Sequence, residues 1–486
     1  MLEYLFYLFV FLLPWQTVFL LREVFIGGEK WEYGTIGVYG IDFFILLFLI
    51  LSSVNYLRNS NFQFPIFNFQ SIFNVLISKF RNSDLTQSSK LKIENYNYVL
   101  RLTSYVLVAW SFLSIIWSSD KLLAFYFSFK LFLAIGLFWA VRRMNFSWRK
   151  LICVLMLAGA LQGALATGQF LAQNDFSSTL LGASQHVVSA GGTSVIETPG
   201  GRWLRAYGTF PHPNVLGGYL AIVLLLVVNF QFSIFNFQFS ILNALISKFR
   251  NSDLIQNFRQ KRISLWLTKL EIGNYNYVLR LTSYVLIFSG LVVSFSRSAW
   301  LVFALGFGLL FLFKREKRRE LAKSAVVFLG VGLIWLAAFS PLFFSRIAGE
   351  ERLEKKSFDD RSTYVLQAKE IIKENFWLGT GAGNYTKAVA DKNPQKPIWQ
   401  IQPVHNVFLL VWSELGIIGL LLFVVFLFLG AIGIFLTDKY LLLLIIPCAL
   451  FFISDHWLWT SHFGLLFLFL ILALISVKNK NISGLF

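Results

Sequence analysis

Residues 417–436 read IIGLLLFVVFLFLGAIGIFL, a stretch without any charged side chain. A transmembrane helix needs about 20 mostly apolar residues to cross a hydrocarbon core about 30 Å thick. This stretch therefore predicts a membrane-spanning helix. The rest of the chain has the same character, because 56% of its 486 residues are apolar and only 14% are charged. Soluble domains carry roughly 25% charged residues, so the composition favours lipid as the surrounding solvent.

We predict an all-α integral membrane protein with about 12 transmembrane helices and a long extracytoplasmic loop that contains an amphipathic helix. The composition argues against a disordered chain, and the net charge of +18 is interpreted as a topology signal rather than a nucleic-acid surface. The two cysteines lie in apolar runs and predict no disulfide framework. The candidate spans are 2–21, 36–56, 103–118, 122–141, 151–172, 211–229, 282–296, 298–313, 324–343, 414–436, 440–455 and 457–477.

Lys and Arg cluster in two short connections, residues 142–150 and 314–319. Cytoplasmic loops carry an excess of these residues, and with about 12 spans both connections fall on one face together with both termini. We therefore expect cytoplasmic termini and two long outer loops, 173–210 and 344–413. Long loops in a compact protein are usually functional.

The second outer loop is amphipathic in part. Tyr364, Ala368, Ile371 and Ile372 recur at helical spacing among charged residues. This pattern predicts a helix that lies along the outer membrane–water boundary.

Residues 62–107 and 230–286 are near-copies that share the strings ISKFRNSDL and NYNYVLRLTSYVL. Duplicated transporter halves diverge and span several helices, whereas these copies are nearly identical and low in complexity. We interpret them as a recently inserted element within cytoplasmic loops, at about 58–102 and 230–281, because long insertions in surface loops cost little stability. An amphipathic hairpin on the membrane surface is the alternative.

Four clusters of polar residues are expected on the outer face, where ionisable side chains are expensive and hence candidates for function. They are Arg202, Arg205, Tyr207, His212 and Asn214 before the sixth span; Ser296, Arg297 and Ser298 between the seventh and eighth; Asp359, Asp360, Arg361 and Ser362 at the start of the amphipathic segment; and His405, Asn406, Glu414 and Gly416 before the tenth.

Each cluster also has a purely structural interpretation. Arg205 and Arg297 can anchor helix ends at the headgroups by extending their charged tips to water. Asp359 and Asp360 are interpreted as caps of the helix that follows them. For Arg297 we favour a functional role over anchoring, because it is a lone arginine in a hinge too tight to need an anchor.

The histidines differ in what their surroundings suggest. His405 can be an interfacial histidine with satisfied hydrogen bonds, and His212, between two prolines, is interpreted as orienting its loop. His456 and His462 flank a short outer turn without ligand-like spacing to any carboxylate, so no metal site is predicted. Lys130 lies in the middle of a span and requires a partner inside the bundle.

Several arginines and a histidine on one membrane face suggest a specific chemistry. Arginine forks suit a diphosphate, and a neutral histidine suits deprotonation of a hydroxyl near neutral pH. The sequence shows no phosphate-binding loop, dinucleotide fingerprint or Asp-x-Asp metal–nucleotide signature. The activated donor is then expected to lie in the membrane already, as a lipid-diphosphate-linked sugar, with arginines stabilising the leaving group as a metal does elsewhere.

Four segments in order resemble the superfamily of O-antigen ligases and polymerases, which are polytopic membrane glycosyltransferases. The segments are RAYGTFPHPNVLGGYL (205–220), SFSRSAWLVFALG (294–306), DDRSTYVLQAKEIIKENFWLGTGAGNY (359–385) and HNVFLLVWSELGIIGLLLF (405–423). The resemblance covers about residues 200–430. It divides the chain into N-terminal helices (1–210), a ligase-like domain (211–436) and C-terminal helices (437–486), and the two repeats interrupt its usual short cytoplasmic loops.

The resemblance implies roles for individual residues. Arg297 and Arg361 would clamp the diphosphate, His405 would be the base that activates the acceptor, and Gly379–Tyr385 would form the tight turn after the outer helix. The candidate catalytic residues are thus His405, Arg297 and Arg361. The candidate substrate-binding residues are Arg205, as a third phosphate contact, His212, Asn214, and Asn406 and Glu414, which would orient His405 or position the acceptor.

The resemblance further implies an inverting, metal-independent transfer without a cofactor. A preassembled glycan would pass from undecaprenyl diphosphate to an acceptor hydroxyl on the outer face of the bacterial inner membrane. The acceptor stays open among lipid A–core, another repeat unit (a polymerase), a protein Ser or Thr and a wall glycan, and we favour the ligase. A flippase or transporter for a lipid-linked glycan is the alternative from another class, but its ionisable residues should lie near the membrane midplane. A purely structural membrane subunit leaves the arginines and histidine unexplained.

Overall fold

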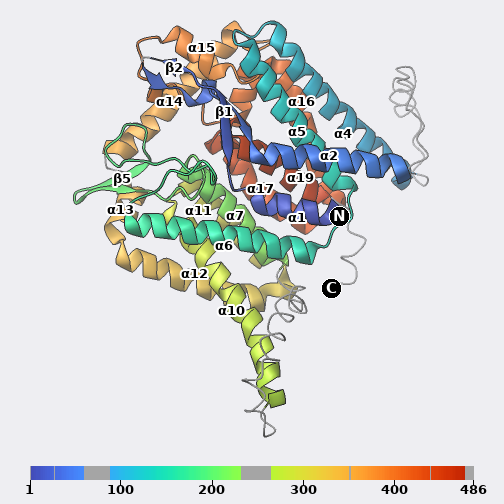
Figure 1. Ribbon diagram of the computed structural model, residues 1–486, viewed down its shortest axis with the longest axis vertical. Helices are drawn as coiled ribbons and strands as arrows, with labels where there is room; N and C mark the ends of the chain where they lie inside the picture. The colour runs from blue at the N-terminus through green and yellow to red at the C-terminus, as the bar shows by residue number, and fades with distance from the viewer. Residues whose placement is uncertain are drawn as a thin grey trace.

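The computed structural model describes residues 2–26, 28–59, 88–230, 264–349, 352–437 and 439–476, and these are mostly helical (Figure 1). Within these residues, seven helices are long and apolar enough to cross a membrane: Gly40–Arg58, Asn97–Ile116, Lys121–Arg143, Trp148–Ala172, Pro213–Phe230, Arg315–Ala338 and Val407–Gly433. Shorter apolar helices cover Leu2–Leu12, Val278–Val293, Arg297–Phe313 and His462–Ser476. The predicted fold class, an all-α integral membrane protein, is confirmed, whereas the number of about 12 spans stays a prediction.

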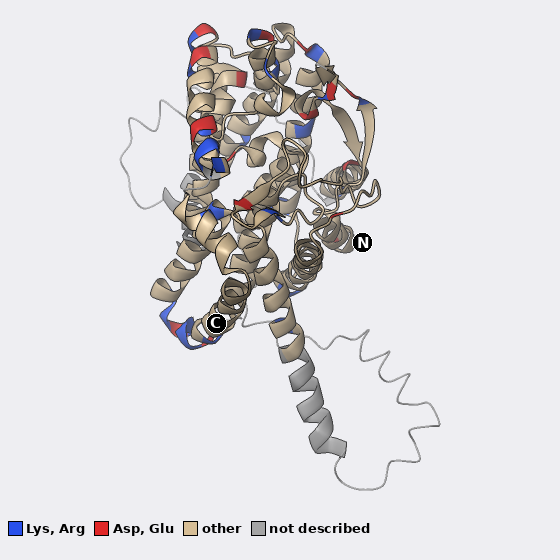
Figure 2. Ribbon diagram, turned by 90° about the vertical axis from the view of Figure 1, so that its left-hand side faces the viewer, with Lys and Arg blue, Asp and Glu red and all other residues tan. Residues whose placement is uncertain are grey.

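The helices follow the expected apolar runs, and Figure 2 shows long uncharged stretches of helix with charged residues gathering near helix ends and in the connections. Their bounds are Leu2–Leu12 (α1), Gly40–Asn59 (α2), Ser88–Leu113 (α4), Lys121–Arg143 (α5), Trp148–Ala172 (α6), Pro213–Phe230 (α7), Ser264–Val293 (α10), Arg297–Phe313 (α11), Arg318–Ala338 (α12), Ser340–Ala348 (α13), Arg352–Glu374 (α14), Tyr385–Lys392 (α15), Val407–Thr437 (α16), Lys439–Ser454 (α17), Trp457–Thr460 (α18) and His462–Ser476 (α19).

Within the described residues, the chain also forms three short antiparallel strand pairs. They pair Val18–Arg22 (β1) with Ile36–Tyr39 (β4), Phe25–Ile26 (β2) with Glu29–Lys30 (β3), and Val195–Thr198 (β5) with Gly201–Leu204 (β6). The first expected span, 2–21, was therefore wrong in its second half. Pro14 lacks an N–H and disfavours helical backbone in the residue before it, so α1 ends at Leu12 and the chain turns into a strand.

The amphipathic helix predicted within residues 344–413 is present as α14, which buries Tyr364, Ala368, Ile371 and Ile372. Its start differs from the expectation. The helix already includes Arg352, so Asp359 and Asp360 lie inside it and do not cap it. Together with α15 and the β2–β3 hairpin, α14 lies at one end of the molecule (Figure 1).

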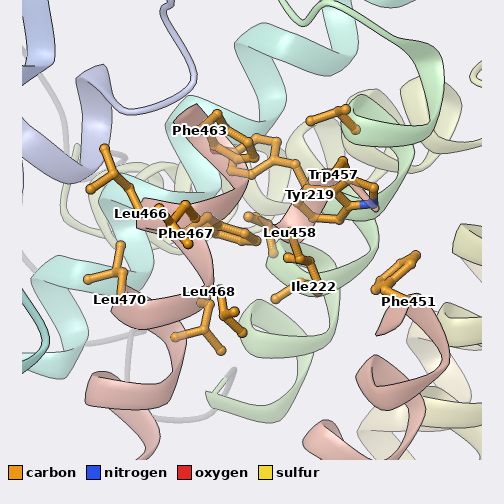
Figure 3. Close-up of a cluster of buried hydrophobic side chains, with 14 of the residues drawn as sticks. Tyr219, Ile222, Phe451, Trp457, Leu458, Phe463, Leu466, Phe467, Leu468 and Leu470 are labelled. Atoms are coloured by element: carbon orange, nitrogen blue, oxygen red, sulfur yellow. The ribbon is translucent and has the colours of Figure 1, made fainter. Parts of the chain in front are cut away.

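The centre of the bundle is α7, because nearly all of its side chains are buried. A helix that is apolar all round needs neighbours on every side, and α6, α10, α11 and α17 supply them. Figure 3 shows Tyr219 and Ile222 of α7 packed with aromatic and aliphatic side chains of α17, α18 and α19. The Tyr219 ring centroid lies 5.6 Å from that of Phe463. This packing brings the N-terminus of α7 beside the turn between α17 and α18.

Gly218 permits this close approach. A Cβ atom there would lie 2.5 Å from Cζ2 of Trp457, nearer than side-chain contacts allow. Only glycine therefore fits between α7 and α18 at this point.

Part of each repeat is helical. Residues 60–87 and 231–263 lie outside the described residues. The string NYNYVLRLTSYVL, however, falls within α4 in one copy and within α10 in the other. Leu100 and Leu107 of α4 are fully buried, and Tyr284 of α10 packs its ring 5.5 Å from that of Phe328. The C-terminal part of each copy thus belongs to a helix of the bundle.

Deleting residues 231–273 is expected to leave membrane insertion and activity intact, because the sequence predicts a surface insertion there and such insertions contribute little to a fold. Membrane fractionation and a transfer assay check this. A variant that inserts normally but has lost activity would contradict the insertion hypothesis. A deletion of 231–286 is the matched control and should fail to fold, since it also removes Tyr284 from the core.

Candidate functional site

Three titratable side chains from two connections meet near one end of the bundle. His405 lies in the segment before α16, and Asp455 and His456 form the turn between α17 and α18. The two imidazole ring centroids are 5.0 Å apart. One nitrogen or oxygen atom from each of the three residues lies within 4.8 Å of the others. Asp455 is buried, so the group forms a partly dehydrated centre around one carboxylate.

Asp455 is held by hydrogen bonds from both sides. Nδ2 of Asn214 donates to Oδ2 at 2.7 Å, and the backbone N–H of His456 donates to Oδ1 at 2.8 Å. Burial by itself raises the pKa of a carboxyl group, but the neighbouring His456, His405 and His212 and the backbone hydrogen bond hold the pKa of Asp455 well below its usual range. The carboxylate is therefore ionised at neutral pH.

The surroundings of His405 favour its unprotonated form, which can accept a proton. Burial, and next the adjacent His456, lower the pKa of His405 to about 4, while Asp455 acts in the opposite direction. The imidazole is therefore neutral at neutral pH. Within the described part of the chain its Nδ1 is buried without a hydrogen-bond partner. The Tyr364 ring is stacked over His405 at 5.9 Å and fixes the plane of the imidazole.

His212 has a fixed orientation beside this centre. Its Nδ1 accepts the backbone N–H of Asn214 at 3.1 Å, and its Nε2 lies 2.8 Å from Oγ of Ser194. The nitrogen that accepts carries no hydrogen, so Nε2 donates to the serine hydroxyl. Burial, and next the charge of Arg205, lower the pKa of His212 to about 3, which keeps this imidazole neutral. These bonds support the interpretation that His212 orients its loop.

The two arginines predicted to bind the diphosphate are both associated with α14: Arg361 lies in this helix, and Arg297 contacts it. Arg361 lies one turn before Tyr364, and its positive charge helps to lower the pKa of His405. The guanidinium carbon of Arg297 lies 4.9 Å from the ring centroid of Phe358, which is one turn before Arg361. Residues three apart on a helix are neighbours on its surface. The helix thus carries Arg361 close to His405, and Arg297 contacts the same helix one turn earlier, at Phe358.

Two other arginines donate hydrogen bonds to the backbone of the hinge that carries Arg297. Nε of Arg205 donates to the Ser294 carbonyl at 2.9 Å, and Nε of Arg346 donates to the Phe295 carbonyl at 3.0 Å. Phe295 has a φ of 49°, which non-glycine residues rarely adopt. Arg205 also donates to Oδ1 of Asn214 at 2.8 Å and is buried. Its contacts suit a positioning role better than the phosphate contact that the resemblance implied.

Two other candidates have local structural partners. Oδ1 of Asn406 accepts the backbone N–H of Leu409 at 3.1 Å and so caps α16 directly after His405. Glu414 accepts Nε1–H of Trp459 at 2.9 Å and backbone N–H groups of the 379–385 turn. Glu414 therefore joins that turn to α16 and α18 and does not hydrogen-bond to His405 in the described part of the chain. The turn itself is present as expected, with positive φ at its three glycines.

Sequence reasoning missed the carboxylates. Asp455 directly precedes His456 in ISDHWLW, and Oδ1 of Asp42 lies 3.0 Å from Nε2 of His462. Each of these two histidines thus has a carboxylate beside it, which the spacing along the sequence had not indicated. The available signal was an aspartate in a short outer turn between two apolar runs. Asp42 also adjoins Lys130, whose ammonium lies 3.9 Å from the Tyr126 ring centroid, so the partners of that lysine lie in the bundle interior.

His405, Asp455 and His456 are ligand types that Zn²⁺ accepts in proteins. The charges around them favour a different occupant. Arg361 lies beside both imidazoles, and Arg205 lies behind Asn214, so the surroundings attract an anion more than a cation. The absence of a metal site stays a prediction.

Residues 282–424 match the family model described as O-antigen ligase. This part of the chain is therefore similar to the O-antigen ligase family. The match confirms the resemblance and includes Arg297, Arg361 and His405. Among curated proteins, none matches the chain. The chain is thus a multi-pass membrane protein with a region that is similar to the O-antigen ligase family. Asn214 and Asp455 lie outside the matched residues, one before and one after them in the chain.

Proposed function

We propose that the protein is a membrane glycosyltransferase of the O-antigen ligase type. It transfers a preassembled glycan from undecaprenyl diphosphate to an acceptor hydroxyl, on lipid A–core or a similar acceptor, at the outer face of the inner membrane. Both termini are then cytoplasmic. The observation that supports this proposal best is that a nitrogen of His405 lies within 4.8 Å of a carboxylate oxygen of the buried Asp455, with the positive charge of Arg361 adjoining them.

The reaction uses these groups in one displacement. The acceptor hydroxyl gives its proton to His405, and its oxygen attacks the anomeric carbon of the donor sugar. The bond between that carbon and the phosphate oxygen breaks, and the diphosphate leaves with the electron pair. Attack from the side opposite the leaving group inverts the anomeric configuration. Asp455 stabilises the imidazolium that forms, since the two charges are opposite and partly dehydrated.

Arg297 and Arg361 would take the part that a metal ion plays in other glycosyl transfers. Guanidinium forks offer paired N–H donors to phosphate oxygens, and the negative charge on the diphosphate grows in the transition state. The reaction then needs neither a metal nor a nucleotide. The position of these groups at helix ends and in connections also argues against a flippase, which should carry ionisable residues near the midplane.

A purified preparation in lipid discs tests the proposal. It receives an undecaprenyl-diphosphate glycan, lipid A–core and EDTA, and the products are analysed by mass spectrometry. We expect one preassembled glycan on the acceptor. A ladder of longer carrier-linked glycans would instead show the polymerase of the same superfamily, and transfer that stops with EDTA would contradict the metal-independent reaction.

Replacing Arg297 by Lys should lower kcat/KM roughly 10- to 100-fold, because lysine keeps the charge but loses the planar fork, and hydrogen bonds to charged groups contribute about 1.5–3 kcal/mol. Steady-state kinetics with the carrier-linked donor measure the effect. Arg202→Lys is the matched control, since Arg202 lies on the exposed β6 strand and pairs with Glu197. Full activity of Arg297→Lys would favour the anchoring role of this arginine.

A further inference from the structure

A second imidazole–carboxylate pair lies in the outer loop between α6 and β5. Oδ1 of Asp175 accepts the backbone N–H of His186 at 2.7 Å, and Oδ2 lies 2.6 Å from Nδ1 of the same histidine. The Asp175 side chain is 1% exposed and that of His186 is 20% exposed. The carboxylate is therefore buried beneath the imidazole, whose outer edge reaches solvent. Neither residue has a part in the reaction described above.

The hydrogen bonds determine what this imidazole offers. Asp175 can only accept when ionised, so Nδ1 of His186 carries the hydrogen between them. In the neutral ring Nε2 then keeps its lone pair and accepts hydrogen bonds. Among the described residues Nε2 has no recorded partner. Such a ring accepts a hydroxyl hydrogen, whereas a phosphate oxygen requires a donor.

His186 is connected to the reaction centre by direct contacts. Its ring stacks on Tyr207 with centroids 3.7 Å apart and an interplanar angle of 15°. The Tyr207 hydroxyl accepts the backbone N–H of Ser194 at 2.8 Å, and Oγ of Ser194 lies 2.8 Å from Nε2 of His212. His212 in turn lies close enough to Asp455 to affect its pKa. The position of His186 is therefore coupled to the groups around His405.

The loop that carries His186 also adjoins the loop that carries His405. On one side, the backbone N–H of Gln16 donates to the Leu181 carbonyl at 3.3 Å. On the other side, a Cβ on Gly192 would lie 3.7 Å from Cβ of Trp399, which lies shortly before His405 in the chain. The loop is thus held between the N-terminal hairpin region and the large outer loop. The loop that carries His186 therefore contacts the segment that leads to His405.

We propose that His186 binds the acceptor: its Nε2 accepts a hydrogen bond from a saccharide hydroxyl that does not react, while Asp175 fixes the ring. The inference rests on the proposed function and adds the acceptor subsite to it. The two substrates are then bound by different chemical groups. The arginines beside α14 hold the donor diphosphate, and the Asp175–His186 pair holds a hydroxyl of the acceptor sugar.

Steady-state kinetics of His186→Ala and Asp175→Asn, with lipid A–core as acceptor and the carrier-linked glycan as donor, test this subsite. The KM for lipid A–core should rise roughly 3- to 10-fold, which corresponds to one hydrogen bond, while kcat and the KM for the donor stay unchanged. His186→Gln should restore part of the affinity, because its Oε1 can accept the same hydroxyl. An unchanged acceptor KM, a fall in kcat alone or a raised donor KM would overturn the proposal.

A labelling experiment on the wild-type protein works even when these variants do not fold or the wild type transfers nothing. Diethyl pyrocarbonate modifies accessible imidazole nitrogens, and peptide mass spectrometry locates the modified residues. We expect His186 to be modified, and lipid A–core without any donor to protect it. The carrier-linked glycan alone should leave the modification unchanged. Protection by the donor, or none by the acceptor, would contradict the acceptor subsite, while absent transfer with intact protection would contradict only the proposed reaction.

Discussion

His405→Ala is expected to abolish glycan transfer and to leave binding of the undecaprenyl-diphosphate glycan largely intact. A general base contributes about 10²- to 10⁴-fold to a rate, and the side chain that would accept the hydroxyl proton is gone. The donor should still bind, because its diphosphate contacts Arg297 and Arg361 in the proposed site. Transfer kinetics and binding of a labelled carrier to the purified protein, measured on the same preparation, check both halves.

Arg361→Ala is the informative companion variant, because it should weaken carrier binding while His405 remains neutral. The two variants then differ in which step they damage. If His405→Ala instead lost carrier binding but kept residual turnover, His405 would be a binding residue and the assignment of the base would be wrong.

Asp455→Asn is expected to lower kcat about 10²-fold and to shift the acid limb of the pH–rate profile to lower pH. Asp455 raises the pKa of His405, because its negative charge favours the imidazolium, so removing that charge lowers this pKa below about 4. Transfer needs neutral His405, and the rate of the variant therefore falls at a lower pH than that of the wild type. The lower kcat follows because a weaker base takes the hydroxyl proton less readily.

A pH–rate profile separates this role from a structural one. If Asp455 only held Asn214 in place, the variant would lose activity without any movement of the acid limb. Asp359→Asn is the matched control, since Asp359 is an exposed carboxylate of α14. Its kcat and profile should equal those of the wild type.

The parts of this protein that could be predicted are those that local sequence determines. Long apolar runs predict membrane helices whatever their neighbours, and the period of Tyr364, Ala368 and Ile371 predicts the buried face of α14. The start of α14 was hidden because the residues before Asp359 are almost all polar and show no helical period. Pro14 was the overlooked signal that divides the first apolar run into a helix and a strand.

Only the site residues that lie in the four segments of the resemblance could be predicted. His405, Arg297 and Arg361 lie in segments that resemble a known superfamily, and the match over residues 282–424 confirms that resemblance. Asp455 lies outside these segments, and its role depends on α7 packing against α17 and α18, which no local pattern reveals. Glu414 was expected to orient His405 or position the acceptor, because the two residues are close in sequence. Its carboxylate instead accepts a hydrogen bond from Trp459.

The central claim is that the protein performs glycan transfer and does not transport its donor. The most direct measurement follows both processes at once in reconstituted liposomes, with a labelled undecaprenyl-diphosphate glycan, lipid A–core and no nucleotide or metal. The account predicts that the label appears on the acceptor and that the carrier does not exchange between leaflets faster than in protein-free liposomes. Exchange of the carrier without any labelled acceptor would contradict the account and show a flippase.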